Sequence, residues 1–235
     1  MPPVLHGEGV LWNSPQIASW AVALADEAGG YRPGAGAELY NDPDKALGPA
    51  YGVSTDVLVL GEGGQATLAF GQTVTDQEGS ADFAVFENGI LDPVTGRIFA
   101  ELARVGVASR ENAGDEDFAY FPAFTDNTEP VPSFGKIDPA LYRGLAGRHP
   151  GGTGTAFDLQ ELKNNPKVLT GTVDLSCIRY IRILDVVGNG SELDDSPLPR
   201  PIYDPFPTWN PDITVNTAGF DLDGVALLDA GEIVP

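Results

Sequence analysis

Several residue types are scarce in this chain of 235 residues, and each scarcity excludes a class of protein. A single cysteine, Cys177, excludes an internal disulfide and is most simply a small apolar residue of a strand. The two histidines, His6 and His149, lie far apart in the sequence, which disfavours a zinc site. No apolar segment reaches the roughly 18 residues of a membrane-spanning helix, so we expect no membrane span.

Basic residues are also few. The chain has 13 Lys and Arg against 34 Asp and Glu, which gives a formal net charge of −21. Such a surface repels phosphate groups, so we expect neither nucleic acid nor an anionic membrane as a partner. It attracts divalent cations. The simpler alternative is a surface that only keeps the protein soluble in a salty or extracellular medium.

Turn-forming residues are abundant instead. The chain has 29 glycines and 20 prolines, and its 42% hydrophobic residues suffice for a core. About eight apolar segments are separated by turn signals, without regular alternation of strands and helices. This pattern predicts an all-β fold, a β-sandwich or jelly roll with long loops, as a single domain over residues 1–235. The unbroken apolar run 83–86 predicts a central strand buried on both faces.

The first 30 residues predict an N-terminal arm, over residues 4–12, and one short helix. Ser14 and Pro15 are typical of a helix start, apolar residues follow at helical spacing, and Gly29 with Gly30 ends the run. Further along, residues 57–60 and 65–70 predict a hairpin around a glycine turn. Residues 109–155 form a long loop insertion whose aromatic residues either pack onto the fold or line a sugar site.

Oxygen-bearing side chains cluster at the ends of the expected strands. Glu87 and Asn88 directly follow the central run, and Asp221 and Asp223, two residues apart in a strand, point to the same side. Calcium takes six to eight oxygen ligands, so we expect Ca²⁺ as a cofactor, with Glu87, Asp221 and Asp223 the best candidates. The full candidate set is Glu87, Asn88, Asp158, Asp185, Asp221, Asp223, Asn41 and Asp42. The alternative is that these residues only cap turns and helices.

Eight short fragments in a fixed order also resemble a known family. They are 40–49, 64–70, 82–89, 103–107, 144–147, 156–159, 178–185 and 219–225, and together they resemble exported bacterial cell-surface proteins that carry PEP-CTERM-type sorting tails. The Ala46-Leu47-Gly48-Pro49 loop is similar to one in discoidin-like, galactose-binding-like jelly rolls, which often hold a structural calcium. The resemblance implies an extracellular or cell-surface location, with any signal peptide and sorting tail absent from this chain.

Three functions remain open at this point. The leading one is a non-catalytic extracellular module, stabilised by calcium, that binds carbohydrate or another cell-surface ligand. The second is a structural subunit of a surface layer, matrix or filament, in which the N-terminal segment pairs with a neighbouring copy. The third is a glycan hydrolase that uses paired carboxylates. We find no nucleophile motif, and His149 is a candidate base only because histidines are so few.

Overall fold

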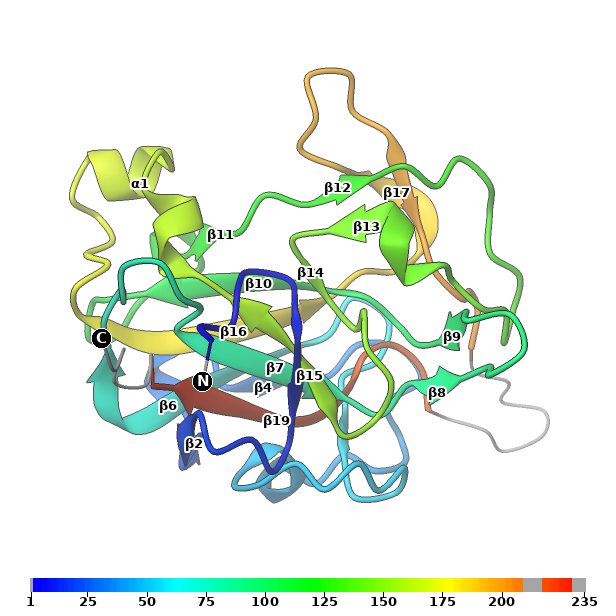
Figure 1. Cartoon of the computed structure of the whole chain (residues 1–235), viewed down its shortest axis with the longest axis horizontal. Helices are drawn as coiled ribbons and strands as arrows, with labels where there is room; N and C mark the ends of the chain where they lie inside the picture. Colours follow the sequence, from blue (N-terminus) through cyan, green and yellow to red (C-terminus); the bar gives the residue numbers. More distant parts are fainter. Residues whose placement is uncertain (1, 209–216, 230–235) are drawn as a thin grey trace.

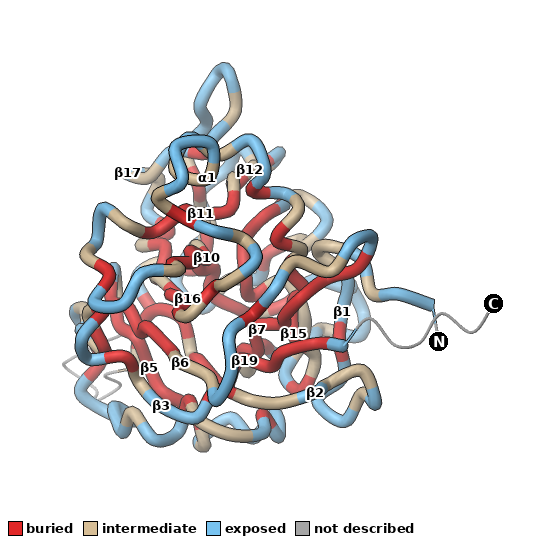
Figure 2. Tube along the Cα trace, turned by 90° about the vertical axis from the view of Figure 1, so that its left-hand side faces the viewer, coloured by how far each residue is buried: buried red, intermediate tan, exposed pale blue. Residues whose placement is uncertain are grey.

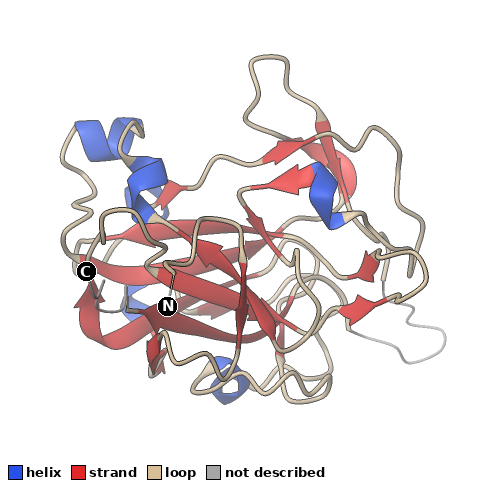
Figure 3. Ribbon diagram, in the orientation of Figure 1, coloured by secondary structure: helices blue, strands red, loops and turns tan. Residues whose placement is uncertain are grey.

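The computed structural model describes residues 2–208 and 217–229, and nearly all regular structure in them is β-strand (Figures 1 and 3). The one α-helix of these residues is the single turn α1 (Pro166–Leu169). Short 3₁₀ turns complete the elements: η1 (Asp26–Ala28), η2 (Pro43–Ala46), η3 (Asp115–Asp117), η4 (Pro139–Leu141) and η5 (Leu159–Leu162). The expected all-β fold is therefore confirmed.

Two antiparallel sheets pack face to face. The first has the order β1 (Gly9–Leu11), β15 (Thr153–Phe157), β7 (Phe83–Glu87), β19 (Asp221–Leu228) and β2 (Ile17–Trp20), and β5 (Leu58–Val59) also pairs with β19. The second has the order β11 (Ala119–Tyr120), β10 (Ala103–Ala108), β16 (Ile178–Asp185), β6 (Gln65–Val74) and β3 (Ala23–Leu24), with β14 (Leu145–Ala146) on β10 and β4 (Tyr31–Arg32) on β6.

The connections between the sheets are those of a jelly roll. Going along the chain, β6, β7, β10, β15, β16 and β19 alternate between the two sheets. The resulting four-strand orders, β2-β19-β7-β15 and β6-β16-β10-β11, interleave early and late strands as two Greek keys do. Three two-stranded ribbons lie outside the sandwich: β8 (Ile90–Leu91) with β9 (Ile98–Phe99), β12 (Phe124–Thr125) with β13 (Tyr142–Arg143), and β17 (Asn189–Leu193) with β18 (Pro201–Tyr203).

The central strand β7 is buried on both faces, as its sequence predicts. Phe83 and Val85 point into the main core, where they meet side chains of the second sheet such as Val105 and Ile183. Ala84 and Phe86 point to the other face, and the ring of Trp20 covers Phe86 at 5.1 Å between centroids. Figure 2 shows this buried centre with exposed loops around it. No helix in the described ranges is long and apolar enough to cross a membrane.

The predicted N-terminal helix is wrong. In its place the chain forms β2, β3 and the short turn η1. The backbone N–H groups of this segment bond to other strands: Ala21 donates to Val225 and Val22 donates to Ala69. Pairing with two sheets thus satisfies donors that a helix would have satisfied locally, and tertiary context overrides the helical spacing of the apolar residues.

The predicted hairpin at residues 57–70 is also wrong. β5 pairs with β19 in the first sheet, whereas β6 pairs with β16 in the second, so the glycine turn between them carries the chain across the sandwich. The turn is held by Gly61, whose N–H donates to Ala218. The expected arm at residues 4–12 does contain a strand, β1, and it pairs with β15 of the same chain.

The long segment 109–155 is mostly packed onto the sandwich. It contributes β11, β12, β13 and β14 and the first residues of β15. Phe118, Phe121, Tyr142 and Leu145 are buried, whereas Phe134 is 53% exposed. Packing therefore accounts for most of its large side chains, and Tyr120 and Pro122 also line a groove beside β11.

Candidate metal centre

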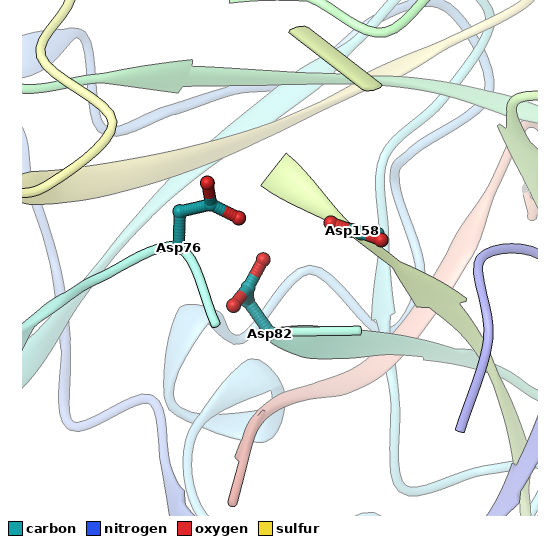
Figure 4. Close-up of side chains that lie close together, drawn as sticks. All are labelled: Asp76, Asp82 and Asp158. Carbon is teal, nitrogen blue, oxygen red and sulfur yellow. The ribbon is translucent and has the colours of Figure 1, made fainter. Parts of the chain in front are cut away.

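Three aspartates meet at the start of the central strand. Asp76 lies in the loop after β6, Asp82 directly precedes β7, and Asp158 directly follows β15. One carboxylate oxygen of each lies within 4.8 Å of the others, and Figure 4 shows the side chains of Asp76 and Asp82 facing each other with Asp158 beside them. We call these three residues the aspartate triad. They form the one cluster of potential metal ligands this close together in the described part of the chain.

The topology brings the triad together because β7 and β15 are neighbouring antiparallel strands. The pair Phe157↔Phe83 ends the ladder, so the residues on either side of it, Asp158 and Asp82, emerge at the same edge. Antiparallel pairing always places the end of one strand beside the start of its partner. Asp76 reaches this edge because its N–H donates to Leu175 O at 3.1 Å, which ties down the loop between β6 and β7.

Backbone hydrogen bonds fix two of the three carboxylates. Asp82 Oδ1 accepts from Gln77 N, and its Oδ2 accepts from Leu159 N, both at 2.7 Å. Asp158 Oδ1 accepts from Gln160 N at 2.8 Å and so caps η5. Each acid therefore has a local structural role, which is the turn-capping alternative that the sequence left open.

Capping does not account for the whole triad, however. Asp76 Oδ2 accepts from the side chain of Gln160 at 2.9 Å, but Asp76 Oδ1 is enclosed and has no hydrogen-bond partner in the described residues. A buried carboxylate oxygen without a partner is energetically unfavourable unless a cation or an ordered water contacts it. No Lys or Arg of the described chain forms an ion pair with any of the three.

The electrostatics of the triad oppose full ionisation without a cation. The pKa of Asp82 is raised to about 7, chiefly by burial and also by the charges of Asp76 and Asp158, against the hydrogen bonds from Leu159 and Gln77. The pKa of Asp158 is raised as well, first by burial and then by Asp76 and Glu161. A divalent cation would reverse both effects, because it favours the charged form of each carboxylate.

Of the ligands predicted from the sequence, only Asp158 belongs to the triad. Glu87, Asp185, Asp221 and Asp223 lie instead around the far end of β7, in a set that we call the carboxylate network: Glu62, Glu87, Glu101, Asp185, Asp204, Asp221 and Asp223. Since Asp82 and Glu87 are five residues apart along extended chain, the two sets are about 17 Å apart. Described network residues make no ion pair with Lys or Arg.

The network is organised mainly by backbone donors. Asp185, 1% exposed, accepts from Phe220 N at 2.6 Å and from Gly63 N at 2.7 Å, and so holds three segments together. Asp204 accepts from Leu102 N at 2.9 Å, and Glu101 accepts from Gly219 N at 3.1 Å and from Thr208 Oγ1. The carboxylates of these acids accept hydrogen bonds from buried N–H groups of irregular loops, which have no backbone carbonyl as a partner.

Burial is the first cause of a raised pKa throughout the network. It raises the pKa of Glu87 well above its usual value, and the charges of Asp221 and Asp223 add to the shift. The pKa of Asp221 rises to about 7, even though Asn88 donates a hydrogen bond to it. That of Glu62 also rises to about 7, and that of Asp223 to about 6. These shifts favour the protonated, neutral form of the carboxyl groups in this set.

The remaining candidates have ordinary surroundings. Asp42 is exposed and caps η2 by accepting from Asp44 N at 3.2 Å, and its neighbour Asn41 is exposed too. Asn88 donates its side-chain N–H to Ser54 O at 3.1 Å. His149 lies 3.2 Å from Gly7 O through Nε2, so it fastens the N-terminal arm, and burial lowers its pKa.

Sequence reasoning missed Asp76 and Asp82. Asp82 comes directly before the central strand, and Glu87 comes at its other end. A search of both ends of that strand would therefore have included Asp82. Asp76 gives no comparable signal, because it lies in a polar loop and only the fold places it against Asp82.

Comparison with known proteins adds no ligand assignment. No family model matches the chain, and no curated protein matches it.

Proposed function

We propose that the protein is a non-catalytic β-sandwich module of the cell surface or extracellular space, stabilised by one Ca²⁺ at the aspartate triad, that binds a carbohydrate or another surface ligand. The observation that carries the calcium proposal is the convergence of three carboxylate oxygens within 4.8 Å, one acid having an enclosed oxygen with no partner in the described chain. Carboxylates, amide oxygens and water are the ligands that calcium prefers.

The triad supplies part of a calcium shell, and its surroundings offer more oxygen. The side-chain amide of Gln160 already touches Asp76, and turning that amide over would present its oxygen instead of its nitrogen. Asp76 and Asp158 are only partly buried, which leaves room for water ligands. Magnesium fits less well, because it demands strict octahedral geometry and prefers water and phosphate. Zinc would need nitrogen or sulfur ligands.

An extracellular setting agrees with a site of this kind. With only three carboxylates, the triad resembles the weak sites of extracellular modules, whose dissociation constants are about 10⁻⁴ to 10⁻³ M. The net charge of −21 favours attraction of divalent cations at such concentrations. The resemblance of the eight sequence fragments to exported cell-surface proteins supports the same setting.

The other two functions have less support. A subunit that donates its N-terminal strand to a neighbour would leave that segment unpaired in its own fold, whereas β1 pairs with β15. A hydrolase needs two carboxyl groups free to act on a substrate, whereas Asp185 uses both oxygens for backbone N–H groups. We therefore retain the binding module as the proposal.

The test is thermal unfolding of the protein in EDTA and in millimolar calcium, with metal analysis of the untreated protein. We expect calcium to raise the melting temperature and Asp82→Asn to abolish the rise. Asp158→Asn should abolish the rise as well, and Asp138→Asn is its matched control, because both aspartates cap a 3₁₀ turn by accepting from a backbone N–H. Identical curves with and without calcium, and no bound metal, would sink the proposal.

A further inference from the structure

The surface carries a groove beside β11, lined by no residue of the aspartate triad or the carboxylate network. Its volume is about 300 Å³, and it is lined by Tyr120, Pro122, Glu161, Asn164, Asp195 and Arg104 among others. This volume is at the lower end of the range for small-molecule sites, about 300 to 1,000 Å³. We infer that the groove binds a single neutral sugar ring. The inference rests on the proposed function, whose ligand it names and places.

The two walls of the groove are fixed to each other. One wall is β11, and the other is the segment from η5 to α1, which lies beside it in Figure 1. Asn165 donates its side-chain N–H to Tyr120 O at 3.4 Å, and Lys167 Nζ donates to Phe118 O at 2.8 Å. The site is therefore formed before any ligand arrives, which lowers the entropy lost on binding.

The same contacts cover the edge of the sheet. β11 is the outer strand on this side, and an unpaired edge would invite a peptide to add a further strand. Because Asn165 already occupies the carbonyl of Tyr120, strand addition is disfavoured. A compact ligand fits the groove better than an extended peptide.

An aromatic ring provides the apolar surface. Tyr120 lies opposite Gly106 on β10, and a Cβ at Gly106 would come within 2.8 to 3.1 Å of three ring atoms. The ring therefore lies close over the glycine backbone, and Tyr120 is only partly buried, so part of its apolar surface stays accessible beside the groove. Ring faces of this kind pack against the C–H surface of a pyranose.

Hydrogen-bonding groups lie around this apolar surface. The Glu161 carboxylate and the Asn164 amide are exposed and make no hydrogen bond to the described part of the protein. Such groups accept from, and in the case of the amide donate to, hydroxyl groups. Asp195 is 46% exposed in its side chain and has only one oxygen engaged, by Arg104 Nη1 at 3.0 Å and Ala123 N at 2.8 Å.

The charges select a neutral ligand. Two carboxylates, Glu161 and Asp195, line the groove, and its cation, Arg104, is occupied by Asp195, by Leu193 O at 2.6 Å and by Glu192 at 3.6 Å. A uronic acid or a phosphate would therefore meet repulsion without a free cation. A neutral hexose meets acceptors, an amide and a ring.

The groove also connects to the triad. Its second wall begins at Leu159, whose N–H donates to Asp82, and the side chain of Gln160 bonds to Asp76. Calcium at the triad would hold the start of this wall, so we expect sugar binding to be tighter with calcium than in EDTA.

The test is saturation-transfer difference NMR on the intact chain with millimolar D-galactose, D-glucose, D-mannose or N-acetyl-D-glucosamine, and with D-glucuronate as the anionic comparison. We expect signal from at least one neutral sugar and none from glucuronate. Tyr120→Ala and Glu161→Ala should each weaken binding about tenfold. Tyr51→Ala is the control, because Tyr51 is an exposed tyrosine that packs against Trp12 and does not line the groove.

Two results would overturn the inference: no signal from any neutral sugar, or a signal that Tyr120→Ala, Glu161→Ala and Asn164→Ala all leave unchanged. If Tyr120→Ala does not fold, the two exposed positions carry the test. The calcium proposal is scored separately, by melting temperature and bound metal. If calcium stabilises the protein but no sugar binds, only the groove inference is rejected. If a sugar binds but calcium has no effect on the melting temperature, only the proposed metal centre is rejected.

Discussion

The two ends of β7 handle acidic residues in different ways. At its start, the aspartate triad brings three carboxylate oxygens within 4.8 Å of one another and leaves one oxygen without a partner in the described residues. At its end, the carboxylate network spreads seven acids over several loops. Backbone N–H groups bond to most of them, while Glu62 Oε1 and Asp221 Oδ1 are enclosed without a partner in the described residues. Convergent carboxylates favour a cation, whereas carboxylates dispersed over several loops act mainly as acceptors for backbone N–H groups.

The largest effect is expected from Asp185→Ala. It leaves the buried N–H groups of Gly63 and Phe220 without an acceptor, and we expect the free energy of unfolding to fall by about 3 kcal/mol. Urea unfolding measures the loss. Asp174→Ala, which removes an exposed acceptor with a local bond to Ser176, is the control and should cost less than about 1 kcal/mol. Equal losses would show that Asp185 does not connect the loops.

The pH dependence should be the next largest effect. Glu62 and Asp221 have pKa values raised to about 7, so between roughly pH 4 and pH 7 the folded state binds more protons than the unfolded state. In EDTA, the contribution of these two groups to the free energy of unfolding is therefore complete below about pH 4. The free energy of unfolding then falls by a few kcal/mol as the pH rises toward 7. Urea midpoints across this range measure the trend.

The double variant Glu62→Gln, Asp221→Asn should reduce the slope of that pH profile, because amides have no proton to lose. Asp82 and Asp223, whose pKa values are also raised, should maintain the remaining slope. A profile that keeps its slope in the double variant would contradict the assignment to these two groups.

Calcium should act at the start of β7 and not at its end. At ten times the dissociation constant, binding to the folded state adds about 1.4 kcal/mol, or about 3–6 °C in melting temperature for a chain of this size. Asp82→Asn should remove the shift, while Glu87→Gln should retain it, because the carboxyl of Glu87 is already held by Gly89 N at 2.6 Å. Loss of the shift in Glu87→Gln alone would move the metal centre to the network.

The smallest effect is expected from Asp42→Ala. Asp42 caps η2 on the surface, so its removal should cost about 0.5–1 kcal/mol and leave the calcium shift intact. Differential scanning calorimetry with and without calcium checks both parts. A lost calcium shift would return Asn41 and Asp42 to the list of metal ligands.

Part of the site could be predicted from sequence and part could not. Asp158 was in the candidate set because it lies beside an apolar residue, Phe157, and the structure places it in the aspartate triad. Asp76 was missed because a loop carries no periodic signal. The predicted helix at residues 14–29 failed because the spacing of Ile17, Trp20 and Leu24 serves two short strands equally well once other strands supply hydrogen-bond partners.

The sequence by itself determined the class of fold and its central strand. An unbroken apolar run such as 83–86 can be buried only with apolar neighbours on both faces, and turn residues recur too often for long helices. The tertiary structure alone decided which acids meet. Hydrogen-bond pairing between β7 and β15 places Asp82 beside Asp158, and the loop after β6 adds Asp76, whereas the acids that share a strand, Asp221 and Asp223, act as acceptors for separate loops. Distance in space, set by strand pairing, decides whether carboxylates can share a cation.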